Sequence, residues 1–326
     1  MNIKQIPGDF LVEEVIELNL EKDKQEYSIF KLTKKEWDEF KLIEKIANYL
    51  HIDQKFIGYA GNKDKKAITI QYISIYKIPK EKIENLKIND VKFEFVGYSK
   101  KRINLGDLKG NKFRIILRDL EKQSKIPKEI QLENYFDEQR FGNEFNTHII
   151  GKLIIQRKFK EACNILKLDV NNNDFIGTLR RQPRRLLKFY ISAYQSYIWN
   201  KTLIEILKKN KVKTLNTPIG ELYFSKFKIK SFKIQIVNFD TPKSKEIDKV
   251  LKEENISRMD FIIRELPELI SDSSDREAII EVNNIKSNWQ DDDLNKNKFK
   301  LELEFFLPNG CYATMLIKKL NSIVED

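Results

Sequence analysis

Apolar and polar residues alternate in short runs through the first third of the chain, a pattern typical of β-strands. It predicts strands over Phe10–Val15, Tyr27–Leu32, Phe56–Tyr59, Ala67–Tyr76, Phe93–Tyr98 and Phe113–Leu117. Between the second and third of these, apolar residues recur at helical spacing and predict an amphipathic helix over Asp38–His51. The first third is therefore β-rich with interspersed helix.

The pattern changes in the middle of the chain and changes back at its end. From Asn143 to about Asn210 the apolar residues form helical stripes. Residues 299–307 then alternate with a period of two, which predicts a strand with one buried face. A Pro308–Gly310 turn and a closing helix over Cys311–Leu320 follow. A β-rich start, a helical middle and a β end indicate a domain that is interrupted by an insertion.

Length and charge suggest two domains and a polyanionic partner. The chain has 326 residues, and its 60 Lys and Arg against 49 Asp and Glu give a net charge of +11. An AT-rich genome also produces many Lys, Ile and Asn, so the distribution of charge is more informative than its total. Four arginines fall within six positions and predict phosphate contacts, with a solvated basic face as the alternative: Arg180, Arg181, Arg184 and Arg185.

Several classes of protein are disfavoured by composition. The chain has no long uncharged apolar run for a membrane span and no signal-peptide pattern. Cys163 and Cys311 lie far apart, which argues against a disulfide framework and for a reducing, cytoplasmic location. Two histidines leave little basis for a zinc site or a Ser-His-Asp triad. We interpret Asp291–Asp293 as a solvated loop rather than a metal site.

The most informative segment for chemistry is the loop Gly58–Lys65. In it, Asp64 lies among three lysines, Lys63, Lys65 and the following Lys66, between two predicted strands. One interpretation is a β-hairpin with a solvated tip. The other is a ligand-binding loop, because glycines allow close backbone approach and an aspartate among cations stays ionised. Such a carboxylate can act as a nucleophile or a general base.

These residues resemble the TruD family of tRNA pseudouridine synthases. The segment from Asn62 to Gln71 is similar to the family's K-D-x-x-A-x-T-x-Q signature. Further similar segments follow in the family's order, between residues 4 and 320: Pro7–Glu14, Leu108–Phe113, Asn134–Phe136 with Gln139–Gly142, Ser192–Tyr197 and Leu307–Thr314. Six ordered motifs are far more specific than any one alone.

The resemblance implies an α/β (α+β) fold. A catalytic domain with a mixed, mainly antiparallel sheet would be built from both chain ends, residues 1–142 and 287–326. A mostly helical insertion, residues 143–286, would interrupt it, and a cleft between the two would receive RNA. A monomer is the family expectation.

The resemblance also implies roles for single residues. Asp64 matches the nucleophile, and Lys4 is the candidate cation that pairs with it. The family's substrate-binding positions fall on Phe10, Asn111, Phe113 and Tyr312. The arginine cluster of the insertion would contact the RNA backbone.

Two substitutions depart from the family pattern. Tyr312 replaces a phenylalanine found in some members, which adds a hydroxyl, and Cys311 replaces the usual serine. Any contact that the serine hydroxyl makes in other members is therefore in doubt here. Glu14 matches an acid of the family motif, but the sequence assigns it no role.

The implied reaction is isomerisation of uridine to pseudouridine in tRNA, at uridine 13 of the D-arm. It involves no redox change and no phosphate transfer, so we expect no cofactor and no metal. Whether Asp64 attacks the ribose C1′ or helps to form a glycal stays open. A non-catalytic RNA-binding module is the alternative, although binding alone gains nothing from Asp64 beside phosphates. An aspartate-dependent hydrolase lacks the usual second carboxylate.

Overall fold

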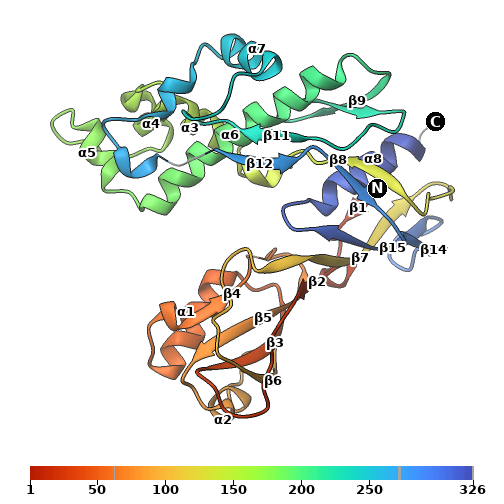
Figure 1. Ribbon diagram of the computed structural model, residues 1–326. Coiled ribbons are helices and arrows are strands. Elements are labelled where there is room, and N and C mark those ends of the chain that lie inside the picture. Colours follow the sequence, from red (N-terminus) through yellow and green to blue (C-terminus); the bar gives the residue numbers. More distant parts are fainter. Residues whose placement is uncertain (62, 271–272, 325–326) are drawn as a thin grey trace. The chain divides into compact units, whose positions relative to one another are not determined.

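The computed structural model describes residues 1–61, 63–270 and 273–324 and divides into two compact units (Figure 1). The first unit comprises Met1–Ile130 and Val282–Gly310, and the second comprises Gln131–Glu281 and Cys311–Asp326. These units are defined by packing. The limits of the family's insertion, after residue 142 and before residue 287, stay a prediction.

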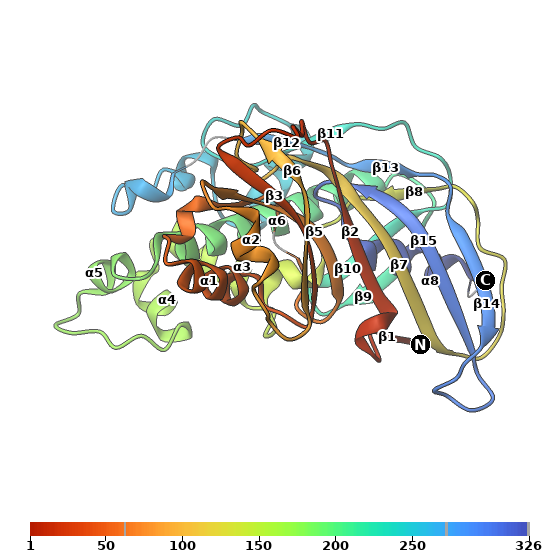
Figure 2. The same cartoon turned by 90° about the horizontal axis from the view of Figure 1, so that it is seen from below.

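The described part of the first unit is built on a nine-stranded sheet with the main order β14-β15-β7-β2-β5-β3-β6 (Figure 2). Short strands β1 and β4 pair with β7 and β5. Among the pairings described for this sheet, β2 with β5 is parallel and the others are antiparallel. This confirms the mixed, mainly antiparallel sheet. Its strands are β1 (Asn2–Ile3), β2 (Phe10–Ile16), β3 (Tyr27–Lys35), β4 (Ile57–Tyr59), β5 (Ile68–Tyr76), β6 (Val91–Ser99), β7 (Leu108–Leu120), β14 (Lys286–Asp291) and β15 (Phe299–Pro308).

One helix covers part of this sheet and closes a core. Helix α1 (Glu39–Leu50) begins where the Asp38 side chain accepts the backbone N–H of Lys41. It ends at His51, whose φ of 55° is left-handed. Its apolar face packs on inward residues of β3, β4 and β5, as the periodicity predicts. The other helices of this unit are η1 (Pro7–Asp9), η2 (Gln54–Phe56) and α2 (Lys80–Glu84).

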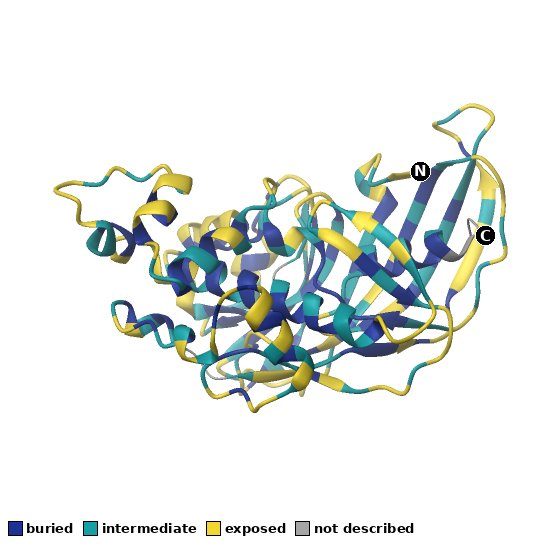
Figure 3. Cartoon of the chain, turned by 90° about the horizontal axis from the view of Figure 1, so that it is seen from above, coloured by how far each residue is buried: buried dark blue, intermediate teal, exposed yellow. Residues whose placement is uncertain are grey.

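The second unit has a helical core and small two-stranded sheets. Its α-helices are α3 (Thr147–Ile155), α4 (Phe159–Ile165), α5 (Phe175–Arg180), α6 (Arg184–Leu207), α7 (Lys245–Glu253) and α8 (Ala313–Val324). The first four confirm the helical stretch expected from residue 143 to residue 210. The closing helix begins at Ala313, two residues later than predicted. Buried side chains of α3 to α7 contribute to the core. Figure 3 shows helices that carry both buried and exposed residues.

The remaining strands of the middle segment were not predicted from the sequence. β9 (Val212–Thr217) pairs with β10 (Gly220–Ser225), and β11 (Lys233–Ile236) pairs with β12 (Ser274–Glu277). β8 (Ile130–Glu133) pairs with β13 (Ile279–Val282). Three short 3-10 helices complete the second unit: η3 (Glu138–Phe141), η4 (Arg258–Phe261) and η5 (Pro267–Leu269).

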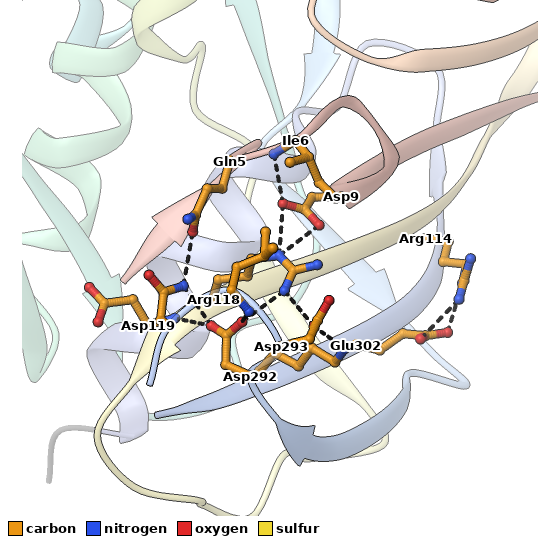
Figure 4. A network of polar contacts seen from close by, with 12 residues as sticks. Gln5, Ile6, Asp9, Arg114, Arg118, Asp119, Asp292, Asp293 and Glu302 are labelled. Atoms are coloured by element: carbon orange, nitrogen blue, oxygen red, sulfur yellow. Dashed lines mark hydrogen bonds and ion pairs between the residues drawn. The ribbon is translucent and has the colours of Figure 1, made fainter. Parts of the chain in front are cut away.

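A buried arginine holds the N-terminal segment of the first unit to its sheet (Figure 4). Arg118 on β7 donates to Asp9 at 2.9 and 3.0 Å, to Asp292 at 2.8 Å and to Asp293 at 2.9 Å. Asp292 is 8% exposed, so the interpretation of Asp291–Asp293 as a solvated loop is wrong at this residue. The physical reason is the arginine, 174 positions away in sequence, which compensates the buried carboxylate.

Candidate active site

Asp64 lies in the connection of the β4–β5 hairpin. Ile57 and Tyr59 pair with Ile75 and Ile73 across the hairpin, so the hairpin interpretation of the backbone is correct. The tip is not fully solvated, because Ala60 and Ala67 at its two ends are buried and the Asp64 side chain is only 33% exposed. Asn62, the first residue of the quoted segment, lies outside the described residues.

Lys4 and Asp64 form an ion pair that joins residues 60 positions apart. Nζ of Lys4 donates to Oδ2 of Asp64 at 2.7 Å and lies 3.9 Å from the centroid of the Phe10 ring. A left-handed backbone at Lys4, with a φ of 60°, turns the chain between β1 and η1. Oδ1 of Asp64 accepts no hydrogen bond from a described residue. The structure thus brings together three of the predicted site residues and leaves one carboxylate oxygen available.

The predicted binding residues of β2 and β7 share one face of the sheet. Val12 lies opposite Phe113, and Glu14 lies opposite Asn111. Phe113 contacts the Phe10 ring edge-on at 6.1 Å and is itself buried. In this state both rings belong to the core, so they form a floor next to Lys4 rather than an exposed platform.

Asn111 offers an unused acceptor on this face. Its side-chain Oδ1 is buried and accepts no hydrogen bond from a residue that the structure describes. Such an atom costs free energy, roughly 1–3 kcal/mol, unless a donor reaches it. A ligand N–H that reaches Asn111 would recover that free energy.

Sequence reasoning assigned no role to Glu14 and none to Lys63, yet the two form a buried ion pair. Nζ of Lys63 donates to Oε1 of Glu14 at 2.7 Å, and the side chains are 5% and 0% exposed. Oε2 of Glu14 accepts the backbone N–H of Tyr72 on β5. Lys63 immediately precedes Asp64, so this pair anchors the loop to the sheet. The alternation of β2, which places Glu14 on the face of Phe10 and Val12, is the signal that could have identified it.

A second buried polar group lies between β3, β5 and α1. Lys34 and Glu39 pair at 3.4 Å, and Gln71 donates to Glu39. Burial lowers the pKa of the Lys34 ammonium and raises the pKa of the Glu39 carboxyl, and their mutual attraction opposes both shifts. The negative charge of Asp64 also acts to raise the pKa of Lys34. The signature loop is therefore bordered by two buried charge pairs.

Tyr312 belongs to the second unit and precedes α8. Its ring meets Phe136 at 6.4 Å in an edge-on arrangement. Burial raises the pKa of its hydroxyl, an effect that the charges of Arg140 and Arg276 oppose. The added hydroxyl is therefore neutral near pH 7.

The arginine cluster also lies in the second unit, on α5 and at the start of α6. Arg180 and Arg181 are 57% and 59% exposed and each lies 3.8 Å from a carboxylate, Glu268 and Asp174 respectively. Arg184 donates to the backbone oxygen of Glu268. Arg185 has interactions of its own. Exposed pairs at this distance contribute little free energy and leave the guanidinium groups accessible.

In the part of the chain that the structure describes, no group of three or more His, Cys, Asp or Glu side chains could hold a metal ion. Over the same residues, no helix is both long and apolar enough to cross a membrane.

Comparison with known proteins agrees with this geometry. The family model described as tRNA pseudouridine synthase D (TruD) matches residues 1–169, 164–239 and 234–320. A relative from Methanococcus maripaludis named "Probable tRNA pseudouridine synthase D 1" is 31% identical over 99% of this chain and 100% of its own length. The tRNA pseudouridine synthase D of Aquifex aeolicus is 27% identical over 98% of both chains.

A solved structure has the same fold. It is a crystal structure of a TruD protein from Methanosarcina mazei, with a TM-score of 0.70 and 26% sequence identity. The match covers 99% of this chain and 93% of the other. These similarities show that the chain belongs to the TruD family of tRNA pseudouridine synthases.

Proposed function

We propose that the chain converts uridine 13 in the D-arm of tRNA to pseudouridine, with Asp64 as the nucleophile. Membership of the family makes the chain a pseudouridine synthase, an isomerase. The observation that carries the finer proposal is the part-buried carboxylate of Asp64, which is held through one oxygen by Lys4 and open at the other. A non-catalytic RNA-binding module would gain nothing from this arrangement.

The chemistry requires few protein groups. The bond between N1 of uracil and C1′ of the ribose breaks, the base turns, and C5 bonds to C1′. C5 then loses its proton and N1 gains one, so that the product is an isomer of uridine. Oδ1 of Asp64 is the atom available to attack C1′ or to take up a proton. The target nucleotide must leave the RNA stack, at a cost of roughly a few kcal/mol.

Residues on the sheet face next to Lys4 and Asp64 would receive the base. Asn111 has an amide donor and an unpaired acceptor, which suit the N3–H and a carbonyl of uracil. Phe10 and Phe113 would line the floor below it. Tyr312, in the second unit, falls on a substrate-binding position of the family and would contact the nucleotide. Lys4 would hold Asp64 in place while RNA phosphates approach.

The role of Lys4 can be tested by removing its charge. Lys4→Met should slow single-turnover pseudouridine formation about 10- to 100-fold, because a hydrogen bond between charged groups contributes about 1.5–3 kcal/mol. The affinity for tRNA should change little. Lys66→Met, an exposed lysine of the same loop, is the matched control and should retain the wild-type rate at saturating tRNA. A wild-type rate for Lys4→Met would show that the reaction does not need Lys4.

The arginine cluster is proposed to contact RNA phosphates. Replacing Arg180, Arg181, Arg184 and Arg185 by glutamine should weaken tRNA binding and leave the chemical step unchanged. If two or three of them contact phosphates, the log–log slope of affinity against salt should flatten by roughly 1.5 to 2.5 units. The matched control replaces all four by lysine, which keeps the charge and should keep most of the slope. Filter binding across a salt series measures both, and an equal slope for the glutamine variant and wild type would refute the assignment.

The site of modification is tested with unmodified tRNA transcripts. After incubation with the chain, carbodiimide treatment and reverse transcription locate pseudouridine. The proposal predicts one new stop, one nucleotide 3′ of position 13, and its loss in a transcript with cytidine at position 13. Pseudouridine at other positions would keep the enzyme class and overturn the choice of uridine 13. No pseudouridine in any transcript would favour the RNA-binding module.

A further inference from the structure

Two arginines of the second unit carry charges that no described carboxylate balances. Arg140 lies in η3 and Arg276 in β12, and neither has an ion pair with an acidic residue of the described chain. Six other arginines each lie within 4 Å of a carboxylate, and Arg102 and Arg184 donate to backbone oxygens instead. The six are Arg114, Arg118, Arg157, Arg180, Arg181 and Arg258. An arginine pair without counter-charge points to an anion that the folded chain does not itself supply.

Both guanidinium groups lie against the same aromatic ring. Cζ of Arg276 is 3.9 Å from the centroid of Phe136 and 5.2 Å from that of Trp199. Cζ of Arg140 is 5.9 Å from the Phe136 centroid and 5.4 Å from that of Phe189. The rings fix the planes of the two guanidinium groups without neutralising them.

The hydrogen bonds of the pair use only part of its donors. Nε and Nη2 of Arg276 donate to the backbone oxygen of Asn134 at 3.2 and 2.9 Å, and Nη2 also reaches its Oδ1 at 2.9 Å. Nε of Arg140 donates to Ser196 at 3.2 Å. Nη1 of Arg276 and both terminal nitrogens of Arg140 donate to no described residue. These three nitrogens are available to an oxyanion.

The neighbouring acidic and titratable groups do not fill that role. Asp137 already accepts the Thr314 hydroxyl at 2.6 Å and the Lys318 ammonium at 2.8 Å. Lys318 also donates to Glu138 at 2.7 Å. Burial raises the pKa of the Cys311 thiol to about 11, against the opposing charge of Arg276, so this thiol is neutral at pH 7. The positive charge of the pair therefore remains.

Burial makes this charge costly to keep. It lowers the pKa of Arg276, and the like charge of Arg140 acts in the same direction. Two like charges at one ring repel each other, and a bound anion would relieve both effects. The pair also lies next to Tyr312, whose ring contacts the same Phe136.

We propose that Arg140 and Arg276 form a binding subsite for a phosphodiester of the RNA backbone, next to the nucleotide that Tyr312 contacts. The planar guanidinium fork fits two phosphate oxygens, and the aromatic rings hold it ready for that contact. This inference rests on the proposed function, because it takes the anion to be part of the tRNA substrate.

Salt dependence of tRNA binding tests the subsite. Arg140→Gln and Arg276→Gln should each flatten the log–log slope of affinity against salt by about 0.7 to 0.9 units, and the double variant by about twice that. The matched control is Arg114→Gln, which removes one charge that Glu302 already balances through two hydrogen bonds. It should leave the slope unchanged. Wild-type slopes for both arginine variants would overturn the proposal.

Two further variants separate binding from folding. Arg276 packs on two rings, so Arg276→Gln could fail to fold. Arg276→Lys keeps the charge and serves as the second variant. It should keep most of the salt slope while its affinity for tRNA falls about tenfold. Arg140→Gln removes a single side-chain hydrogen bond and decides the proposal on its own. Far-UV circular dichroism and thermal melting check each variant.

The source of the anion and the proposed function have separate readouts. If the subsite binds a phosphodiester of RNA, inorganic phosphate at constant ionic strength should compete with tRNA only weakly. Strong competition by phosphate that disappears in Arg140→Gln would instead assign the subsite to free phosphate. If the wild-type chain forms pseudouridine and both variants keep the wild-type salt slope, the subsite alone is refuted. If the wild type forms no pseudouridine but the slopes flatten, the proposed reaction fails and the RNA contact stands.

Discussion

Asp64→Asn is expected to reduce pseudouridine formation by at least about 1000-fold, the scale of losing a nucleophile. The amide keeps the shape of the side chain, and its oxygen can still accept the hydrogen bond of Lys4. It cannot attack C1′ or take up the C5 proton, because it has neither the charge nor the basicity of a carboxylate. The rate would be measured in a single turnover at saturating tRNA.

Binding and folding controls make this result specific. The affinity of Asp64→Asn for tRNA should stay within about threefold of the wild type, because the side chain is not a phosphate contact. Asp23→Asn, an exposed aspartate of the same unit, is the matched control and should keep full activity. A purified Asp64→Asn variant that works near the wild-type rate would show that another group is the nucleophile.

Arg118→Met is expected to lower the free energy of unfolding by about 3–5 kcal/mol. The substitution leaves the carboxylates of Asp9 and Asp292 buried without their cation (Figure 4). Urea unfolding followed by circular dichroism measures the change. On the same strand, Arg114→Met breaks an exposed pair with Glu302 and should cost at most about 1 kcal/mol. An equal loss for both variants would contradict a central role for Arg118.

The same network gives a pH dependence with a definite sign. Burial alone would raise the pKa of Asp292, but hydrogen bonds from Asn295, two backbone N–H groups and Arg118 outweigh it and hold this pKa well below its usual range. The stabilisation is therefore present above the ordinary carboxyl pKa of about 4 and lost as the pH falls below it. Arg118→Met should show a shallower loss of stability on acidification.

The network also connects stability to the site. Asp9 accepts Arg118 and the backbone N–H of Ile6, so it fixes the turn between Lys4 and Phe10. Arg118→Met should consequently slow the reaction even under conditions where the variant is folded. A folded variant with the wild-type rate would separate the two effects.

Local elements could be predicted from the sequence because their signals are local. The period-two alternation of residues 299–307 reports the buried face of β15, and helical spacing with Asp38 as its cap reports α1. Strands β9 to β12 were not predicted. β11 and β12 have only four residues each, so the alternation of Lys233–Ile236 is too short to identify a strand by itself. The start of α8 differed by two residues, since the Pro308–Gly310 turn does not define where the helix begins.

The contacts that build the site join residues that are far apart in the sequence. Lys4–Asp64 was expected only through the family resemblance, because nothing local relates residues 60 positions apart. Glu14–Lys63 and Arg118–Asp292 span 49 and 174 positions and were not foreseen. An acidic or basic residue at an inward strand position indicates such a contact, because a buried charge needs a partner of opposite charge.

Release of tritium from RNA labelled at C5 of uridine tests the central claim most directly. Formation of the C5–C1′ bond expels the C5 hydrogen, so a pseudouridine synthase releases tritium to water while the base stays in the RNA. The account predicts this release with wild-type chain and none with Asp64→Asn. Labelled uracil free in solution would indicate a hydrolase, and an unchanged RNA that the chain still binds would indicate a binding module; either result would contradict the account.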